Sequence, residues 1–166
     1  MQKNRGLKIV SLICAVHWKS IKEKIIAEST VVSTEELEKI ALEKLELMCE
    51  AADETKAHAI TVLDVRGQTP IADYFVICTG TSATHIKSIA ENVRDKMREE
   101  SKVRTKPQGG AESFWIILDY GDVILHIFDE ETRAFYDLER LWSDAKPIDW
   151  NSAAGENKEE SAAIES

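Results

Sequence analysis

Two aspartates, Asp119 and Asp122, form the carboxylate pair with the most suggestive spacing in the chain. They flank Tyr120-Gly121 between two apolar runs. Such a pair could hold a metal ion, but aspartate is also typical of tight turns, where its side chain accepts backbone hydrogen bonds. A third ligand is not evident nearby in the sequence. The pattern therefore favours a hairpin turn over a metal centre, and no cofactor is expected.

The other reactive side chains are scattered along the chain. They comprise four histidines and three cysteines: His17, His58, His85, His126, Cys14, Cys49 and Cys78. The histidines lack the spacing of metal ligands, and the cysteines are odd in number with no Cys-x-x-Cys motif, so we expect small buried thiols in a reducing compartment. His85 falls on the polar side of a predicted helix and is expected to be solvated. No serine or cysteine nucleophile is visibly placed with His126.

Length and charge indicate one globular domain with tails. The 166 residues carry a net charge of −9, with 43% hydrophobic and 31% charged residues. Residues 1–34 carry six Lys/Arg and two Glu, whereas residues 35–150 carry fourteen Lys/Arg and twenty-four Asp/Glu. An acidic body argues against broad binding to nucleic acid, including direct DNA binding, because phosphates require basic groups. It is compatible with a basic partner.

The amino-terminal segment resembles the start of a signal peptide, since basic residues precede an apolar run at residues 9–16. That run is too short to span a bilayer and lacks a small-x-small cleavage site, so we expect a cytoplasmic protein without a membrane anchor. We divide the chain into a basic, flexible extension over 1–33, a folded domain over 34–146 and an acidic, disordered tail over 147–166.

Periodicity predicts an α/β order of elements. Apolar residues at helical spacing predict helices over about 34–55, 83–100 and 129–143, and apolar runs predict strands over 59–65, 74–79, 114–119 and 122–128. Ser33 and Glu36 form a capping box for the first helix, and Ser82 caps the second. The strand at 74–79 is apolar throughout and is expected to be central. We expect a small single domain with a mixed β-sheet flanked by helices.

Three further local expectations follow from the same patterns. In the third helix, Ala134, Leu138 and Leu141 share one face. Residues 102–112 contain proline and glycine and are expected to form a loop. Pro147 is expected to end the regular structure.

The last two predicted strands form a hairpin with one unusual face. A two-residue turn at Tyr120-Gly121 would place Trp115 opposite His126 and Asp119 opposite Asp122. One face is then wholly apolar, while the other mixes large apolar with polar side chains: Trp115, Ile117, Asp119, Asp122, Ile124, His126 and Phe128. Either a helix covers this mixed face, or it binds a protein, with Trp115 as anchor and the acids selecting a basic partner.

Four segments, in this order and spacing, resemble the ribosomal silencing factor family, also called the Iojap family. They are Asp64-Val65-Arg66-Gly67, Ile77 to Ser82, Trp115 to His126 and Tyr136 to Trp142, within residues 36–143. The resemblance implies a nucleotidyltransferase-like fold and a regulatory role without enzymatic activity, often as a homodimer. Family members bind a large-subunit ribosomal protein, number fourteen, at the subunit interface. They thereby stop the small subunit from joining and repress translation when nutrients are scarce.

The resemblance also assigns roles to five matching positions: Trp115, Asp119, Asp122, His126 and Tyr136. Trp115 and Tyr136 would be apolar anchors, and the two aspartates would attract the basic ribosomal partner. Two alternatives remain open, a nucleotidyltransferase-fold enzyme and a large-subunit assembly factor such as the family's organellar members. An enzyme is disfavoured because Gly80-Thr81-Ser82 is not followed by the strand-borne carboxylate pair that would hold two Mg²⁺ ions.

Overall fold

The computed structural model describes residues 33–150. The elements in chain order are α2 (Thr34–Glu54), β1 (His58–Asp64), β2 (Tyr74–Thr79), α3 (Ala83–Glu100), β3 (Gln108–Gly110), the 3₁₀ turn η1 (Ala111–Ser113), β4 (Trp115–Asp119), β5 (Val123–Phe128), α4 (Glu130–Tyr136), α5 (Leu138–Leu141) and β6 (Lys146–Ile148). The expectations for Cys14, His17, the basic extension and the end of the acidic tail lie outside these residues. None of the helices in this range combines the length and apolar character that crossing a membrane requires.

The strands form one mixed sheet, in the order β3-β4-β5-β2-β1-β6. The central pair β2 and β5 is parallel, and the remaining pairs are antiparallel. Five of the six residues of β2 are buried, which confirms that its apolar run is a central strand. The mixed sheet flanked by helices confirms the predicted fold class.

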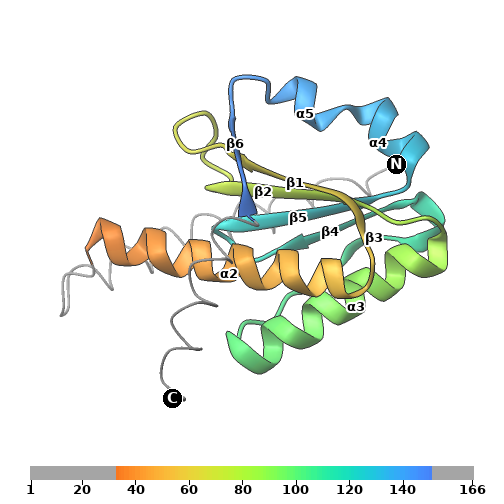
Figure 1. Ribbon diagram of the computed structural model, residues 1–166, viewed down its shortest axis with the longest axis horizontal. Helices are drawn as coiled ribbons and strands as arrows, with labels where there is room; N and C mark the ends of the chain where they lie inside the picture. The colour runs from red at the N-terminus through yellow and green to blue at the C-terminus, as the bar shows by residue number, and fades with distance from the viewer. Residues whose placement is uncertain (1–32, 151–166) are drawn as a thin grey trace, which may run out of the picture. The chain divides into compact units, whose positions relative to one another are not determined.

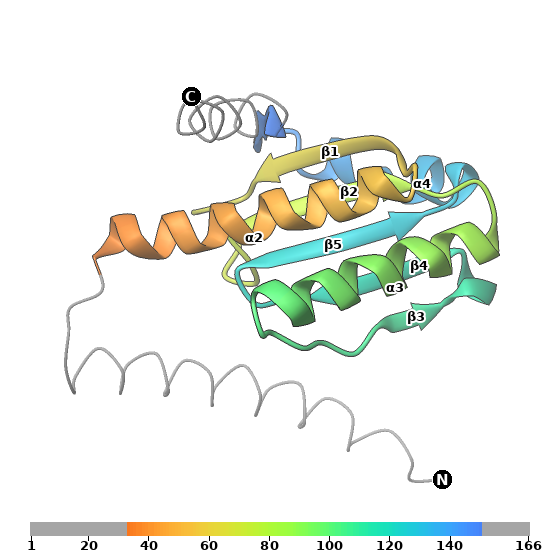
Figure 2. The same ribbon diagram turned by 60° about the horizontal axis from the view of Figure 1, so that its bottom comes forward.

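Helices cover both faces of the sheet (Figure 1). From Lys39 onward, α2 lies beside α3 on one face, and the turned view in Figure 2 shows both helices running roughly along the direction of β5. Leu45, Met48, Ile86 and Ile89 anchor these helices in the larger core. The short helices α4 and α5 lie on the opposite face, over a smaller core to which Leu138 and Trp142 contribute partly buried side chains.

Side-chain caps define the helix starts as the sequence predicted. Ser33 and Glu36 make the reciprocal capping box, with the Glu36 carboxylate accepting from the Ser33 N–H at 2.9 Å and the Ser33 hydroxyl accepting from the Glu36 N–H at 3.2 Å. The Ser82 hydroxyl accepts from the His85 N–H at 3.1 Å.

The expectation that His85 is solvated is wrong. Its Nδ1 accepts from the Thr81 N–H at 3.0 Å, which leaves Nε2 protonated to donate to the Thr55 carbonyl at 2.8 Å. His85 therefore joins the start of α3 to the end of α2, a contact that only tertiary structure creates.

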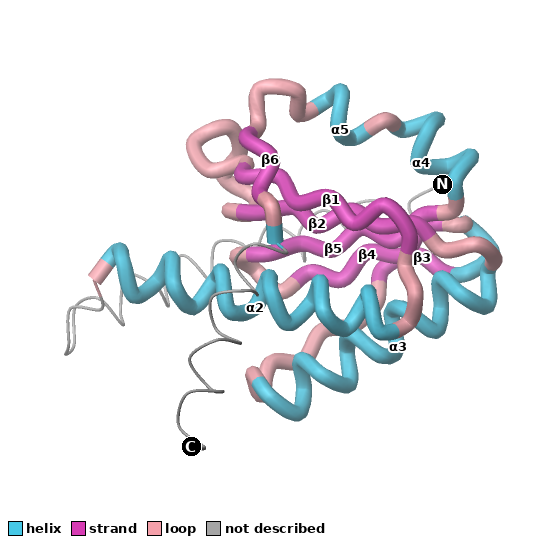
Figure 3. The backbone as a smooth tube through the Cα atoms, viewed as in Figure 1, coloured by secondary structure: helices cyan, strands magenta, loops and turns pink. Residues whose placement is uncertain are grey.

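The third predicted helix is broken, and Figure 3 shows a non-helical joint between α4 and α5. Asp137 adopts φ 44°, in the left-handed region, and its side chain accepts from the Arg140 N–H to begin α5. Because α4 and α5 are separate helices, residues before and after the break no longer share one face, and the predicted apolar face of a single helix is wrong. Ala134 is exposed and Leu141 is 69% exposed, while Leu138 packs against the smaller core.

Two short strands appear where the sequence predicted a loop or the end of regular structure. β3 lies inside the predicted loop and pairs with β4, and its middle residue, Gly109, has φ 81°. Pro147 lies within β6, which is an edge strand of the sheet. Proline is tolerated in an edge strand because the N–H that it lacks is not needed for hydrogen bonds in the centre of the sheet.

The hairpin register differs from the prediction by two residues. Trp115 pairs with Phe128, Ile117 with His126, and Asp119 with Ile124. The connection contains three residues instead of two, and Gly121 takes φ 86° within it. Because side chains alternate with a period of two, an even shift keeps the strand residues on their predicted faces.

Candidate functional site

An aromatic face lies where α4 meets the open end of the β4–β5 hairpin, where β4 begins and β5 ends. We use this name for Trp115, His126, Phe128, Phe135 and Tyr136. The Trp115 ring lies 4.9 Å from Phe128 and 4.7 Å from Tyr136, centroid to centroid. His126 and Phe128 are buried beneath, Trp115 is half-buried, and Tyr136 and Phe135 are 47% and 81% exposed. The face thus has a rigid floor and an exposed aromatic rim.

Local backbone structure brings Tyr136 back over the sheet. β5 ends at Phe128, and the Asp129 carboxylate then caps α4 by accepting from the Thr132 N–H at 2.8 Å. The Asp129 N–H also donates to the Phe114 carbonyl at 3.0 Å, which holds the helix start against the beginning of β4. Because α4 is only seven residues long, its last residue, Tyr136, still lies above Trp115.

A partly buried hydrogen bond orients the Trp115 indole. Its Nε1–H donates to Nδ1 of His126 at 3.3 Å, so His126 accepts at Nδ1 and carries its proton on Nε2. Burial lowers the pKa of His126 to about 4, because the apolar surroundings penalise the charged imidazolium. His126 is therefore neutral near pH 7 and supports Trp115 from below.

The two predicted acidic residues separate in the structure. Asp119 is exposed on the same sheet face as Trp115, and its carboxylate accepts from the Gly121 N–H at 2.9 Å within the turn. The Asp122 carboxylate instead pairs with the Lys44 ammonium of α2 at 2.9 Å, on the side of the sheet that α2 covers. Of the five predicted site residues, Trp115, His126 and Tyr136 come together, Asp119 shares their sheet face but lies at the opposite end of β4, and Asp122 lies apart.

Both cysteines within residues 33–150 lie in the larger hydrophobic core. This range contains no group of three or more His, Cys, Asp or Glu side chains that could hold a metal ion. Cys49 and Cys78 are buried, and burial raises the pKa of both thiols, to about 12 for Cys78. A Cβ on Gly80 would press into Ile86, which fits a closely packed turn at this position.

Phe135 and Arg133 belong to the site but were not found by sequence reasoning. Phe135 packs edge-on against Tyr136, with ring centroids 5.1 Å apart. Two adjacent aromatic residues on a helix cannot both face the sheet, so one of them must point outward. The adjacent pair Phe135-Tyr136 in the sequence could therefore have indicated one exposed aromatic ring. Arg133 gave no such signal, because its partners are distant in the chain.

The fold and this face define a class of protein: an α/β domain with a mixed sheet that presents an exposed aromatic surface. A family model described as "Ribosomal silencing factor during starvation" matches residues 38–166. The chain therefore belongs to the ribosomal silencing factor family, which confirms the resemblance seen in its motifs.

Individual relatives agree with this assignment. "Ribosomal silencing factor RsfS" of Bacillus subtilis (strain 168) is 37% identical over 105 residues, which cover 63% of this chain and 89% of that protein. "Protein Iojap, chloroplastic" of Zea mays is 40% identical over 106 residues, covering 61% of this chain and 44% of that protein. A crystal structure of a Chromobacterium violaceum protein matches with a TM-score of 0.59 at 30% identity, covering 64% of this chain and 88% of that one.

Proposed function

We propose that this protein is a cytoplasmic ribosomal silencing factor that acts by binding and has no enzymatic activity. It binds the large ribosomal subunit through a basic ribosomal protein, number fourteen, and sterically blocks the small subunit from joining. Translation is thereby repressed when nutrients are limited. The observation that carries the proposal is the aromatic face, in which exposed Tyr136 packs against a half-buried Trp115 and exposed Phe135 packs against Tyr136.

The aromatic face has the anatomy of a protein-binding hot spot. Hot spots are enriched in tryptophan and tyrosine, and they combine exposed contact area with well-packed support. Trp115 receives such support from the Phe128 ring and from its hydrogen bond to His126. An indole held in one orientation loses little conformational entropy on binding, so more of its contact energy contributes to affinity.

Charge favours a basic partner for the same surface. Exposed Asp119 lies on this side of the sheet, and α4 begins with Glu130 and Glu131. The whole chain has a net charge of −9. An acidic surface speeds encounter with a basic protein and disfavours contact with bare RNA phosphates. Steric occlusion then requires only that the bound domain fill space that the small subunit would occupy.

Sedimentation tests the proposal directly. The full chain is mixed with purified large subunits and centrifuged through sucrose, and small subunits are then added to measure joining. We expect the protein to move with free large subunits, to be depleted from joined ribosomes, and to reduce joining as its concentration rises. Protein that stays at the top of the gradient would contradict the proposal. Ultracentrifugation of the chain alone tests the homodimer that the family resemblance implies.

Substitutions in the aromatic face test whether it makes the contact. Trp115→Ala should weaken binding to large subunits by about thirtyfold, the equivalent of a typical hot-spot loss of about 2 kcal/mol. Ile71→Ala is the matched control, because Ile71 is 65% exposed in the β1–β2 loop, at the other end of the strands. Circular dichroism checks that both variants fold. Equal affinities for Trp115→Ala and the wild type would place the contact elsewhere.

A further inference from the structure

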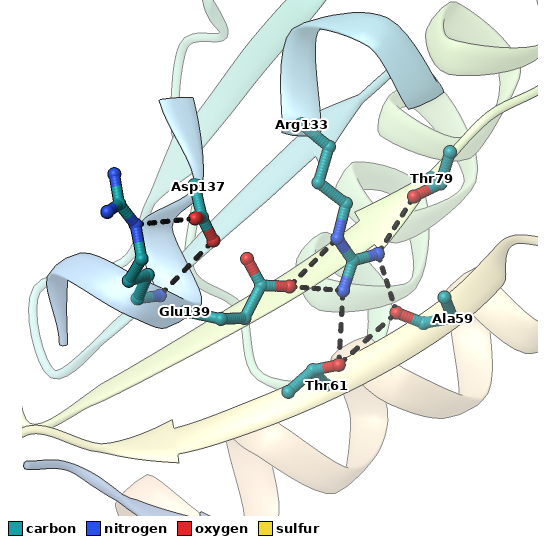
Figure 4. A network of polar contacts seen from close by, with 7 residues as sticks. Ala59, Thr61, Thr79, Arg133, Asp137 and Glu139 are labelled. Carbon is teal, nitrogen blue, oxygen red and sulfur yellow. Dashed lines mark hydrogen bonds and ion pairs between the residues drawn. The ribbon is translucent and has the colours of Figure 1, made fainter. Parts of the chain in front are cut away.

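Arg133 of α4 occupies an unusually complete hydrogen-bond site (Figure 4). Its Nε and one Nη donate to a Glu139 carboxylate oxygen, the Nε bond measuring 2.8 Å. The other Nη donates to the Ala59 carbonyl at 2.7 Å and the Thr79 hydroxyl at 2.8 Å, and the Thr61 hydroxyl lies 3.1 Å from the first Nη. A guanidinium has five N–H donors, and each of them has an acceptor here.

Irregular backbone in β1 creates one of these acceptors. The β1–β2 pairing passes from His58–Thr79 to Thr61–Ile77, which inserts one extra residue into β1 as a bulge. Within the bulge, Ala59 adopts φ 48°, a left-handed conformation that costs a residue with a Cβ about 1 kcal/mol or more. The Ala59 carbonyl at this bulge accepts from Arg133. The fold therefore maintains a strained residue at the point where α4 is attached.

The helices that Arg133 attaches are weakly held otherwise. α4 has seven residues and α5 has four, and neither contains a fully buried residue. Helices this short are unstable by themselves and depend on tertiary contacts. The Arg133 side chain is only 15% exposed and spans β1, β2 and α5, so it fixes both helices against the sheet. Tyr136 lies three residues further along the same helix.

We propose that Arg133 is a positioning residue for the aromatic face. Its guanidinium is bound to the β1 bulge and to Glu139, and it holds α4 and α5 in place. It thereby preorganises Tyr136 over Trp115 and Phe135 beside Tyr136. The inference rests on the proposed function, because the surface that Arg133 orders is the one proposed to bind the ribosome. A lysine cannot replace it, since an ammonium has three donors and lacks the planar geometry that reaches separate acceptors.

Local order and binding are measured separately to test this role. Hydrogen exchange followed by mass spectrometry reports on residues 130–142, and the Trp115 indole N–H signal, assigned by its loss in Trp115→Phe, reports on the ring stack. In Arg133→Ala we expect exchange in 130–142 to accelerate about tenfold, as for a locally unfolded segment, with β2 and β5 unchanged. The indole signal should shift, and affinity for large subunits should fall about tenfold through lost preorganisation.

Comparison variants separate positioning from general stability. Arg133→Lys should behave like Arg133→Ala. Arg140→Ala is the matched control, because Arg140 lies in α5, is 85% exposed and forms a local ion pair with Asp137 at 2.8 Å. Exchange and affinity should therefore stay at wild-type values. If Arg133→Ala fails to fold, Glu139→Gln removes one charge from the site and should give a smaller acceleration in the same segment.

Several outcomes would overturn the inference. Unchanged exchange over 130–142 in Arg133→Ala would show that other contacts hold the helices. Faster exchange with wild-type affinity would show that the order of α4 and α5 does not matter for binding. Wild-type exchange and affinity in Arg133→Lys would show that a positive charge alone is sufficient at this position. If the wild-type protein itself does not bind large subunits, the proposed function fails and Arg133 has no binding surface to position, whatever the exchange shows.

Discussion

The buried imidazole of His126 makes the stability of the protein depend on pH in a defined window. The ordinary histidine pKa is 6.5, and burial lowers that of His126 to about 4. The difference of about 2.5 units corresponds to about 3 kcal/mol, at about 1.4 kcal/mol for each unit. Between pH 6.5 and 4 the unfolded chain binds a proton that the folded chain does not, so the free energy of unfolding falls as the pH is lowered.

Substitution of His126 isolates this contribution. In His126→Asn an amide oxygen can take the place of Nδ1 as acceptor for the Trp115 indole, but the side chain no longer titrates. We expect urea denaturation, followed by circular dichroism at fixed ionic strength, to give a wild-type unfolding free energy that drops from pH 7 to pH 4 by about 3 kcal/mol more than that of the variant. Carboxylates titrating in this range affect both proteins, so the difference reports on His126.

The exposed residue His58 provides the matched control, and His58→Asn should follow the wild-type curve. The test has a direct counterpart in NMR, where the His126 ring protons should titrate well below pH 6. Parallel curves for the wild type and His126→Asn would refute the reasoning. So would a His126 titration near pH 6.5, because either result would mean that water or a counter-charge reaches the ring.

Three further predictions concern exposure and pairing. Phe135→Ser should leave the free energy of unfolding unchanged within about 0.5 kcal/mol, because the ring is 81% exposed, yet weaken the sedimentation of the protein with large subunits. Lys44→Ala should cost about 1 kcal/mol in urea denaturation by removing the partly buried ion pair with Asp122, while binding is retained. Cys49 and Cys78 should react slowly with a thiol reagent in the native state at pH 8 and rapidly in urea, since burial raises both pKa values.

The sequence predicted the long elements well because their signals are local. The helix from residue 83 to 100 has both a cap and an apolar stripe, and the strand at 74–79 is apolar along its length, so both were found with correct bounds. The strands β3 and β6 have three residues each and show no periodicity. They exist because neighbouring strands offer them pairing partners.

Two errors in detail have physical causes that act beyond the local pattern. The helix breaks at Asp137 because this residue adopts a left-handed backbone conformation although it is not glycine. The pattern of apolar positions does not reveal such a conformation. The predicted hairpin register was wrong because it depended on the length of the turn. The register shift was two residues, an even number, so Trp115 and Asp119 stayed on the predicted face.

The candidate site was found only in part for similar reasons. The strand pattern grouped Trp115 with His126, whereas Tyr136 was connected to them by the family resemblance alone. The separation of Asp122 from this group depends on Lys44, which lies 78 residues earlier in the chain. The bonds of Arg133 to Ala59 and Thr79 likewise join distant segments and leave no local trace.

The parallel pairing of β2 with β5 has a consequence for the synthesis of the protein. β2 ends at Thr79, but its central partner β5 begins only at Val123, after α3 and two further strands have been made. A nascent chain therefore exposes β2, a strand with five buried residues in the folded protein, with one edge unpaired until residue 128 has left the exit tunnel. Pairing between segments so far apart is slow and leaves the open edge vulnerable to aggregation. We therefore expect the emerging chain to need protection by a chaperone at the ribosome during this interval.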